Sequence, residues 1–100
     1  MLYRSTRGHA EAMQLLPALW NDICAFAGVG TLAEGKPTGC YLDSSGQPLL
    51  DNTTSEEIGL LIPADGGFVI ARQGDYLVKA DGDLLKLTPS EFAMQPFKAA

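Results

Sequence analysis

The stretch from Ile58 to Met94 constrains the fold of this chain more than any other part of the sequence. It consists of short apolar runs separated by turn-forming glycine, aspartate and proline residues, and the runs are IGLLI, FVIAR, DYLVKA and DLLKL. Runs of this kind are typical of β-strands joined by tight turns. Asp81-Gly82 gives the clearest hairpin signal, because a two-residue turn of this type needs positive φ at its central positions. The stretch therefore predicts an antiparallel meander.

The alternation of side chains within these runs indicates a sheet with one covered face. Tyr76, Val78 and Ala80 would point to one side of their strand, whereas Leu77 and Lys79 would point to the other. Strands that are apolar on one side and mixed on the other suit an antiparallel sheet packed against a single layer. We therefore expect helices on one face of this sheet.

The sequence period changes after the last apolar run. Thr88-Pro89-Ser90-Glu91 places a hydroxyl at the N-cap, proline at the first helical position and glutamate three residues after the cap. This pattern is a capping box with a well-placed proline. It predicts a short helix at residues 89–95, ended by Pro96, with Phe92 folded back onto the sheet.

Pro17 determines how the first third of the chain is interpreted. A proline ends or begins a helix, because it lacks an N–H group and restricts the residue before it. We therefore predict the main helix at residues 17–27, with Pro17 at its first position and Gly28 just past its end. Its wide apolar stripe, which includes Trp20, would pack on the sheet.

The segments on either side of this helix have weaker patterns. Residues 10–15 are predicted as a strand, although the alternative of a helix there stays open. Residues 38–43 are also predicted as a strand, followed by a turn and a return along residues 48–51, where an edge strand tolerates Pro48. The predicted fold is thus a single α+β domain over residues 1–100, with an antiparallel meander packed against one main helix and a short C-terminal helix.

Length and charge exclude several classes of partner. One hundred residues are enough for one domain, and 46% hydrophobic with 19% charged residues is a globular composition. A net charge of −5 argues against direct nucleic-acid binding, which needs Lys and Arg to replace counterions. It suits a basic protein partner, or simply solubility. No apolar run is long enough for a membrane span, and the N-terminal residues are too polar for a signal peptide, so we expect a cytoplasmic protein.

The chain offers few residues for catalysis or metal binding. His9 is the single histidine, and Cys24 and Cys40 lie in core-like patterns that indicate buried thiols. Three such residues at irregular spacing do not make a tetrahedral zinc site. No orienting acid accompanies a histidine–cysteine pair, so we expect no catalytic residues, no metal, no cofactor and no enzymatic activity.

Basic and aromatic residues of the predicted strands are the remaining candidates for binding. Arg72, Lys79 and Lys86 could form a small anion-binding patch, although the sequence favours the simpler explanation of a polar row that discourages edge pairing. Together with two tyrosines, these strands supply the candidate ligand- or partner-binding residues, which are Arg72, Lys79, Tyr41 and Tyr76.

The C-terminal part of the chain resembles a family of small uncharacterised phage and prophage proteins. The similar segments are residues 71–80 (ARQGDYLVKA), 82–84 (GDL) and 89–92 (PSEF), and the family signature is PGDWIIKG, a short spacer and GEFYPCKPDIF. The resemblance implies a fold and a phage or prophage origin, but it gives no information about mechanism. Clear departures from the signature are Gln73, Tyr76, Ala80, Leu87 and Thr88.

These features together predict a non-catalytic, phage-derived binding protein. We expect an inhibitor of a bacterial defence system, such as an anti-CRISPR or other anti-defence protein, that contacts a host protein or defence complex in the host cytoplasm. Two alternatives stay open: a sponge that sequesters a small nucleotide signal, and a virion or assembly accessory protein. An unpaired sheet edge also suggests a homodimer.

Overall fold

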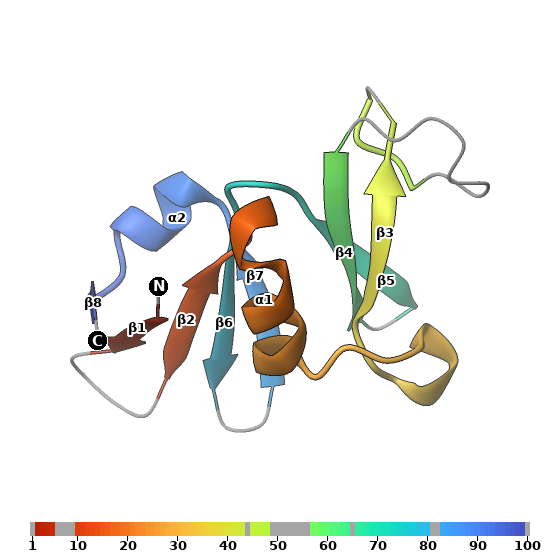
Figure 1. The fold of residues 1–100 in the computed structure, drawn as a ribbon. Helices are drawn as coiled ribbons and strands as arrows, with labels where there is room; N and C mark the ends of the chain where they lie inside the picture. The colour runs from red at the N-terminus through yellow and green to blue at the C-terminus, as the bar shows by residue number, and fades with distance from the viewer. Residues whose placement is uncertain are drawn as a thin grey trace.

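The protein has the predicted α+β class, with strands and short helices interleaved along the chain (Figure 1). The computed structural model describes residues 2–5, 10–43, 45–48, 57–64, 66–80 and 83–99. Its strands are β1 (Leu2–Ser5), β2 (Glu11–Gln14), β3 (Thr38–Leu42), β4 (Glu57–Ala64), β5 (Gly67–Ala71), β6 (Tyr76–Ala80), β7 (Asp83–Leu87) and β8 (Phe97–Ala99). Its helices are α1 (Trp20–Ala27) and α2 (Pro89–Ala93), with 3-10 turns η1 (Pro17–Leu19) and η2 (Leu32–Glu34).

The described strands form two antiparallel sheets. The five-stranded sheet A has the order β7-β6-β2-β1-β8, and the three-stranded sheet B has the order β3-β4-β5. The predicted meander is therefore divided, since β4 and β5 belong to sheet B while β6 and β7 belong to sheet A. The expectation of one continuous meander sheet is wrong in this respect.

The segment between β5 and β6 carries the chain from one sheet to the other. The N–H of Gly74 donates to the carbonyl of Leu15 (2.9 Å), and the N–H of Leu15 donates to the carbonyl of Asp75 (2.8 Å). Gly74 has a φ of +94°, which suits glycine. β2 then pairs with β6, from Glu11 opposite Lys79 to Gln14 opposite Tyr76. β2 therefore occupies the position beside β6 that a simple meander would give to β5.

The core joins both sheets to α1. Its buried side chains come from sheet A and the residue after β2, from α1 and from sheet B, and they are Met13, Leu15, Ile23, Leu60, Ile62, Ala71 and Leu77. Trp20 and Phe26 pack against this cluster from α1. Neither sheet therefore has a core of its own.

The main helix begins and ends where the sequence predicts. Pro17 starts a 3-10 turn, and the α-helix follows directly from Trp20. Gly28 is left-handed, with φ +69° and ψ +48°, and its N–H donates to the carbonyl of Cys24 (3.0 Å). A glycine in this conformation is a common helix C-terminus.

The capping box of α2 is also confirmed. The Thr88 hydroxyl accepts from the N–H of Glu91 (3.2 Å), and the Glu91 carboxylate accepts from the N–H of Thr88 (2.8 Å). The helix covers Pro89–Ala93, two residues shorter than the predicted 89–95. Phe92 folds back onto sheet A as expected, with its ring stacked on Tyr76 at a centroid distance of 3.7 Å.

The remaining predictions have mixed outcomes. β2 confirms a strand within residues 10–15, and β3 confirms one within residues 38–43. Pro48 forms an isolated bridge with Leu42, while residues 49–51 lie outside the described residues, as do His9 and the Asp81-Gly82 turn. The pairing of β6 with β7 extends as far as Ala80 opposite Asp83, as the predicted hairpin requires. β1 and β8, which the sequence did not predict, lie side by side at one edge of sheet A (Figure 1).

Neither of the described helices has the length and apolar character needed to cross a membrane.

Candidate functional site

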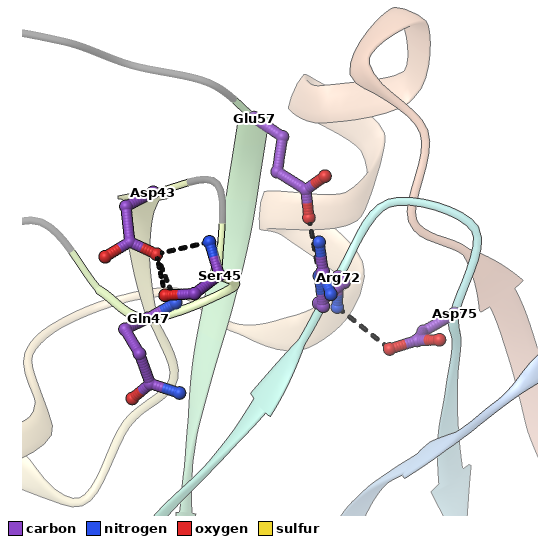
Figure 2. A network of polar contacts seen from close by, with 6 residues as sticks. All are labelled: Asp43, Ser45, Gln47, Glu57, Arg72 and Asp75. Atoms are coloured by element: carbon purple, nitrogen blue, oxygen red, sulfur yellow. Dashed lines mark hydrogen bonds and ion pairs between the residues drawn. The ribbon is translucent and has the colours of Figure 1, made fainter.

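Arg72 lies on sheet B and has an acidic partner (Figure 2). Its Nε donates to Oε1 of Glu57 (2.8 Å), and its backbone N–H donates to Oδ2 of Asp75 (2.9 Å). The hydrogen bond and the charge of Glu57 raise the pKa of the Arg72 guanidinium. Arg72 is thus already paired within the chain.

A polar turn lies against the same guanidinium. Oδ1 of Asp43 accepts from the N–H of Ser45 (2.9 Å), the hydroxyl of Ser45 (2.7 Å) and the N–H of Gln47 (2.9 Å), as Figure 2 shows. These bonds, led by that from Gln47, lower the pKa of the Asp43 carboxyl. A Cβ on Gly46 would lie 3.0 Å from Nη1 of Arg72, so the turn contacts the arginine closely. The network therefore holds this turn against sheet B.

Lys79 lies on sheet A and interacts with the end of α1. Its Nζ donates to the carbonyl of Phe26 (3.0 Å) and lies 5.1 Å from the centroid of the Phe26 ring. A cation at a helix C-terminus interacts favourably with the helix dipole, and a cation over a ring is attracted to its π-face. Both contacts stabilise the fold, and neither needs a bound ligand to explain it.

Tyr76 belongs to an aromatic cluster on the other face of sheet A, since side chains alternate along a strand. Besides stacking on Phe92, its ring lies 5.8 Å from that of Tyr3, and Phe97 stacks on Phe92 at 5.1 Å. Burial is the largest cause that raises the pKa of the Tyr76 hydroxyl, followed by Tyr3. This cluster ties β1, β6, α2 and β8 together.

Tyr41 is the one predicted candidate that lines a pocket within the described part of the chain. It lies in β3 with 39% of its surface exposed, and the open pocket beside it has a volume of about 320 Å³. The other lining residues are Trp20, Gly39, Cys40 and Ile58. We call this hollow the Trp20–Tyr41 pocket.

A second hollow opens at the other end of α1. It has a volume of about 540 Å³ and lies between the end of β4 and the start of β7. Its lining residues are Ala27, Gly35, Pro37, Ile62, Pro63, Ala64, Asp83, Leu84 and Leu85. Since Trp20 is the first residue of α1 and Ala27 the last, the helix runs between the two hollows. We call the second hollow the Leu85 pocket.

The four predicted binding residues do not meet at one site. Arg72 and Tyr41 belong to sheet B and have different neighbours, while Lys79 and Tyr76 point to opposite faces of β6. The expected patch of Arg72, Lys79 and Lys86 is also not formed, because Arg72 pairs with Glu57 on the other sheet.

Trp20 also lines the pocket, whereas the sequence favoured a core position for it and left a ligand platform as the alternative. Its indole lies over Gly39, where an added Cβ would be 2.7 Å from the ring atom Cζ2. A glycine inside a predicted strand often marks a close approach by another group, and Gly39 in TGCYL was such a signal.

The thiols and acids of the described residues do not form a reactive or metal-binding cluster. Burial raises the pKa of both Cys24 and Cys40, which favours the protonated thiol. No group of three His, Cys, Asp or Glu side chains in the described ranges is arranged to hold a metal ion.

The protein is an α+β domain with two antiparallel sheets that share one core, and open hollows lie at both ends of its main helix. Comparison with family models, curated proteins and solved structures finds no match to this chain.

Proposed function

We propose that this protein is a non-catalytic inhibitor that acts by protein–protein contact. The resemblance of its C-terminal part to phage and prophage proteins makes a bacterial defence complex the expected target, in the host cytoplasm. The observation that carries the proposal is the pair of hollows at the ends of α1, each with a large exposed side chain, Tyr41 or Leu85, among its lining residues.

Large apolar side chains at the two hollows remain exposed. Tyr41 lines one hollow, and Leu85, 55% exposed, lines the other. Val69 is exposed as well, and it lies opposite Ile62, which lines the Leu85 pocket. Aromatic anchors such as Tyr, packed in pockets, are among the groups that contribute most to binding energy at protein interfaces. The hollows are therefore suited to receive side chains of a partner.

Charge supports a basic partner. Twelve acidic residues against seven basic ones give the chain its net charge of −5. Complementary charge accelerates association and disfavours partners of like charge. An acidic inhibitor can in this way occupy a basic surface that its target uses for nucleic acid.

The nucleotide sponge has less support. It needs cationic and aromatic groups that converge on one ligand, whereas Arg72 pairs with Glu57 and Lys79 with the carbonyl of Phe26. No contact among the described residues favours it over the inhibitor.

A panel of bacterial strains tests the proposal, each strain carrying one defence system and challenged with a phage that the system restricts. We expect expression of this protein to restore plaque formation in at least one strain, and the purified chain to co-elute with that system's complex. Tyr41→Leu combined with Leu85→Ser should weaken both effects by at least about tenfold, since each anchor typically contributes more than 1 kcal/mol.

Met94→Ser is the matched control, because Met94 is 86% exposed and lies just after α2, outside the residues that line the two hollows. The proposal fails if no system in the panel is inhibited, or if the double variant inhibits as well as the wild type. A nucleotide released from the purified protein by heating would support the sponge instead, and recovery of the protein in purified virions would support the accessory protein.

A further inference from the structure

The walls of the Trp20–Tyr41 pocket are two aromatic rings and an aliphatic side chain. Tyr41 is paired with Ile58 across β3 and β4, so both side chains project from the same face of sheet B. Gly39, two residues before Tyr41, projects to that face too, and the Trp20 indole covers it. The absence of a side chain at Gly39 fixes how closely the indole approaches the sheet.

Charge favours a cationic occupant of this pocket. None of the residues that line it is basic. The chain as a whole carries a net charge of −5, and complementary charge favours association with a cationic group over an uncharged or acidic one.

We propose that the Trp20–Tyr41 pocket binds an arginine side chain of the partner protein. A guanidinium is attracted to the faces of Trp and Tyr rings, and its planar shape lets it stack where a lysine ammonium cannot. The methylene groups of the arginine would lie against Ile58, as long basic side chains do on apolar surfaces. The inference deepens the proposed function, since it names the chemistry of the anchor that one of the two hollows receives.

The single tryptophan of the chain makes the pocket directly observable, because its indole N–H gives one resolved NMR signal. The probe is a capped Gly-Arg-Gly peptide, titrated at low salt into the 15N-labelled protein. The comparison probe is the same peptide with citrulline, which has the shape of arginine without its charge. We expect a saturable shift of the Trp20 signal with the arginine peptide, and binding at least about fivefold weaker with citrulline.

Three variants separate the pocket from general charge attraction. Tyr41→Leu should weaken arginine binding about fivefold, whereas Tyr41→Phe should bind like the wild type because it keeps the ring. Phe68→Leu is the matched control: Phe68 is a similarly exposed aromatic side chain of sheet B, and it points to the opposite face, being paired with Pro63. It should leave binding unchanged, and the NMR spectrum of each variant shows whether it is folded.

Equal binding of the two peptides overturns the inference, as does a Tyr41→Leu variant that is folded and binds arginine normally. A shift that never saturates also overturns it, because that indicates only diffuse attraction. These results are distinguishable from failure of the proposed function: arginine binding without inhibition of any defence system rejects the target class, and inhibition without arginine binding rejects only this pocket chemistry.

Discussion

Sheet A and sheet B share a core, but they are covered differently. Sheet A has α1 against one face and the aromatic cluster of Tyr3, Tyr76, Phe92 and Phe97 against the other. Sheet B is held at its outer face by the polar contacts of Arg72 and the turn that follows β3, and the two hollows open at the ends of α1. Apolar packing covers most of sheet A, although Leu85 of β7 stays exposed at the Leu85 pocket. Sheet B leaves Tyr41, Phe68 and Val69 exposed.

The difference shows how a small chain can combine stability with exposed anchors. Strands from the two ends of the chain, β1 and β8, join sheet A and extend its apolar cover. Sheet B contributes Leu60, Ile62 and Ala71 to the common core, so it remains anchored although its face is incompletely covered. The binding surface can therefore stay open without unfolding the sheet that carries it.

The largest expected effect tests whether the two sheets fold as one unit. Leu77 in sheet A and Leu60 in sheet B are both fully buried in the shared core. Leu77→Ala and Leu60→Ala should each lower the free energy of unfolding by about 2–5 kcal/mol, through lost burial and a residual cavity. Urea unfolding followed by circular dichroism and by Trp20 fluorescence should give one coincident transition for each variant. Two separate transitions for Leu60→Ala would show that sheet B unfolds independently.

The second effect concerns the contact between α1 and sheet B. In Gly39→Ala the new Cβ would lie 2.7 Å from the Trp20 indole, which packs against the core and has little room to move. Such overpacking should cost about 1–3 kcal/mol of stability and shift the fluorescence maximum of Trp20.

Gly30→Ala is the control for this variant. Its nearest neighbours would be atoms of the exposed Lys36 side chain, Cδ at 2.5 Å and Cβ at 3.1 Å, which can adjust more easily than a packed indole. The loss of stability should therefore be smaller than in Gly39→Ala. An equal loss in both variants would mean that the cost comes from removing a glycine and not from the indole.

The sequence predicted local structure well because local signals determine it. Pro17 and Gly28 mark the limits of the main helix, and Thr88 with Glu91 forms the capping box that starts α2. The alternation in β6 also matches the structure, since Lys79 contacts α1 on one face of the strand and Tyr76 stacks on Phe92 on the other. Each of these signals depends on residues only a few positions apart.

The division into two sheets could not be predicted in the same way. Alternation shows which side chains share a face, but it does not show which strand lies alongside. Gln73-Gly74 has the composition of a hairpin turn, yet Leu15, far away in sequence, accepts the hydrogen bond of Gly74. β1 and β8 were missed because they are short and partly polar. The contacts that hold them, the rings of Tyr76 and Phe92 on Tyr3 and the pairing of β1 with β8, join residues far apart in sequence.

The candidate site was predicted only in part. Tyr41 does line a pocket, whereas Arg72, Lys79 and Tyr76 have structural partners elsewhere. Residue types alone indicate which groups can bind a ligand, and the tertiary fold decides which of them are free to do so.

A smaller loss of stability is expected from a change at α2, the helix that carries Phe92 onto sheet A. Thr88→Ala removes the hydroxyl that accepts from the N–H of Glu91, and it should cost about 1 kcal/mol of stability. Because α2 carries Phe92 onto Tyr76, the near-ultraviolet circular dichroism of the stacked rings should weaken as well. Ser90→Ala changes another exposed hydroxyl of α2 and should have no comparable effect. Unchanged ring signals in Thr88→Ala would show that the aromatic cluster holds α2 without its cap.

The smallest expected effects are two local losses of stability at low pH. One is in the turn that follows β3 and contacts sheet B, and the other is at the start of α2, which packs on sheet A. The pKa of Asp43 is lowered mainly by the N–H of Gln47, and the pKa of Glu91 is lowered mainly by hydrogen bonding to Thr88. A carboxyl whose pKa is lower in the folded state stabilises the fold fully above its unfolded pKa, about 3.9 for Asp and 4.3 for Glu. This contribution is lost as the pH falls through the folded pKa, because protonation removes the acceptor charge.

Amide hydrogen exchange between about pH 5 and pH 2 can follow the two sites separately, the first at Ser45 and Gln47 and the second at Thr88. Asp43→Asn keeps a side-chain oxygen for the turn but cannot titrate, so it should abolish the acid loosening at Ser45 and Gln47 and leave that at Thr88 intact. Glu91→Gln should do the reverse. If either variant abolished both transitions, the covers of the two sheets would be energetically coupled, and the contrast between a largely covered sheet A and a more exposed sheet B would not hold at the level of local stability.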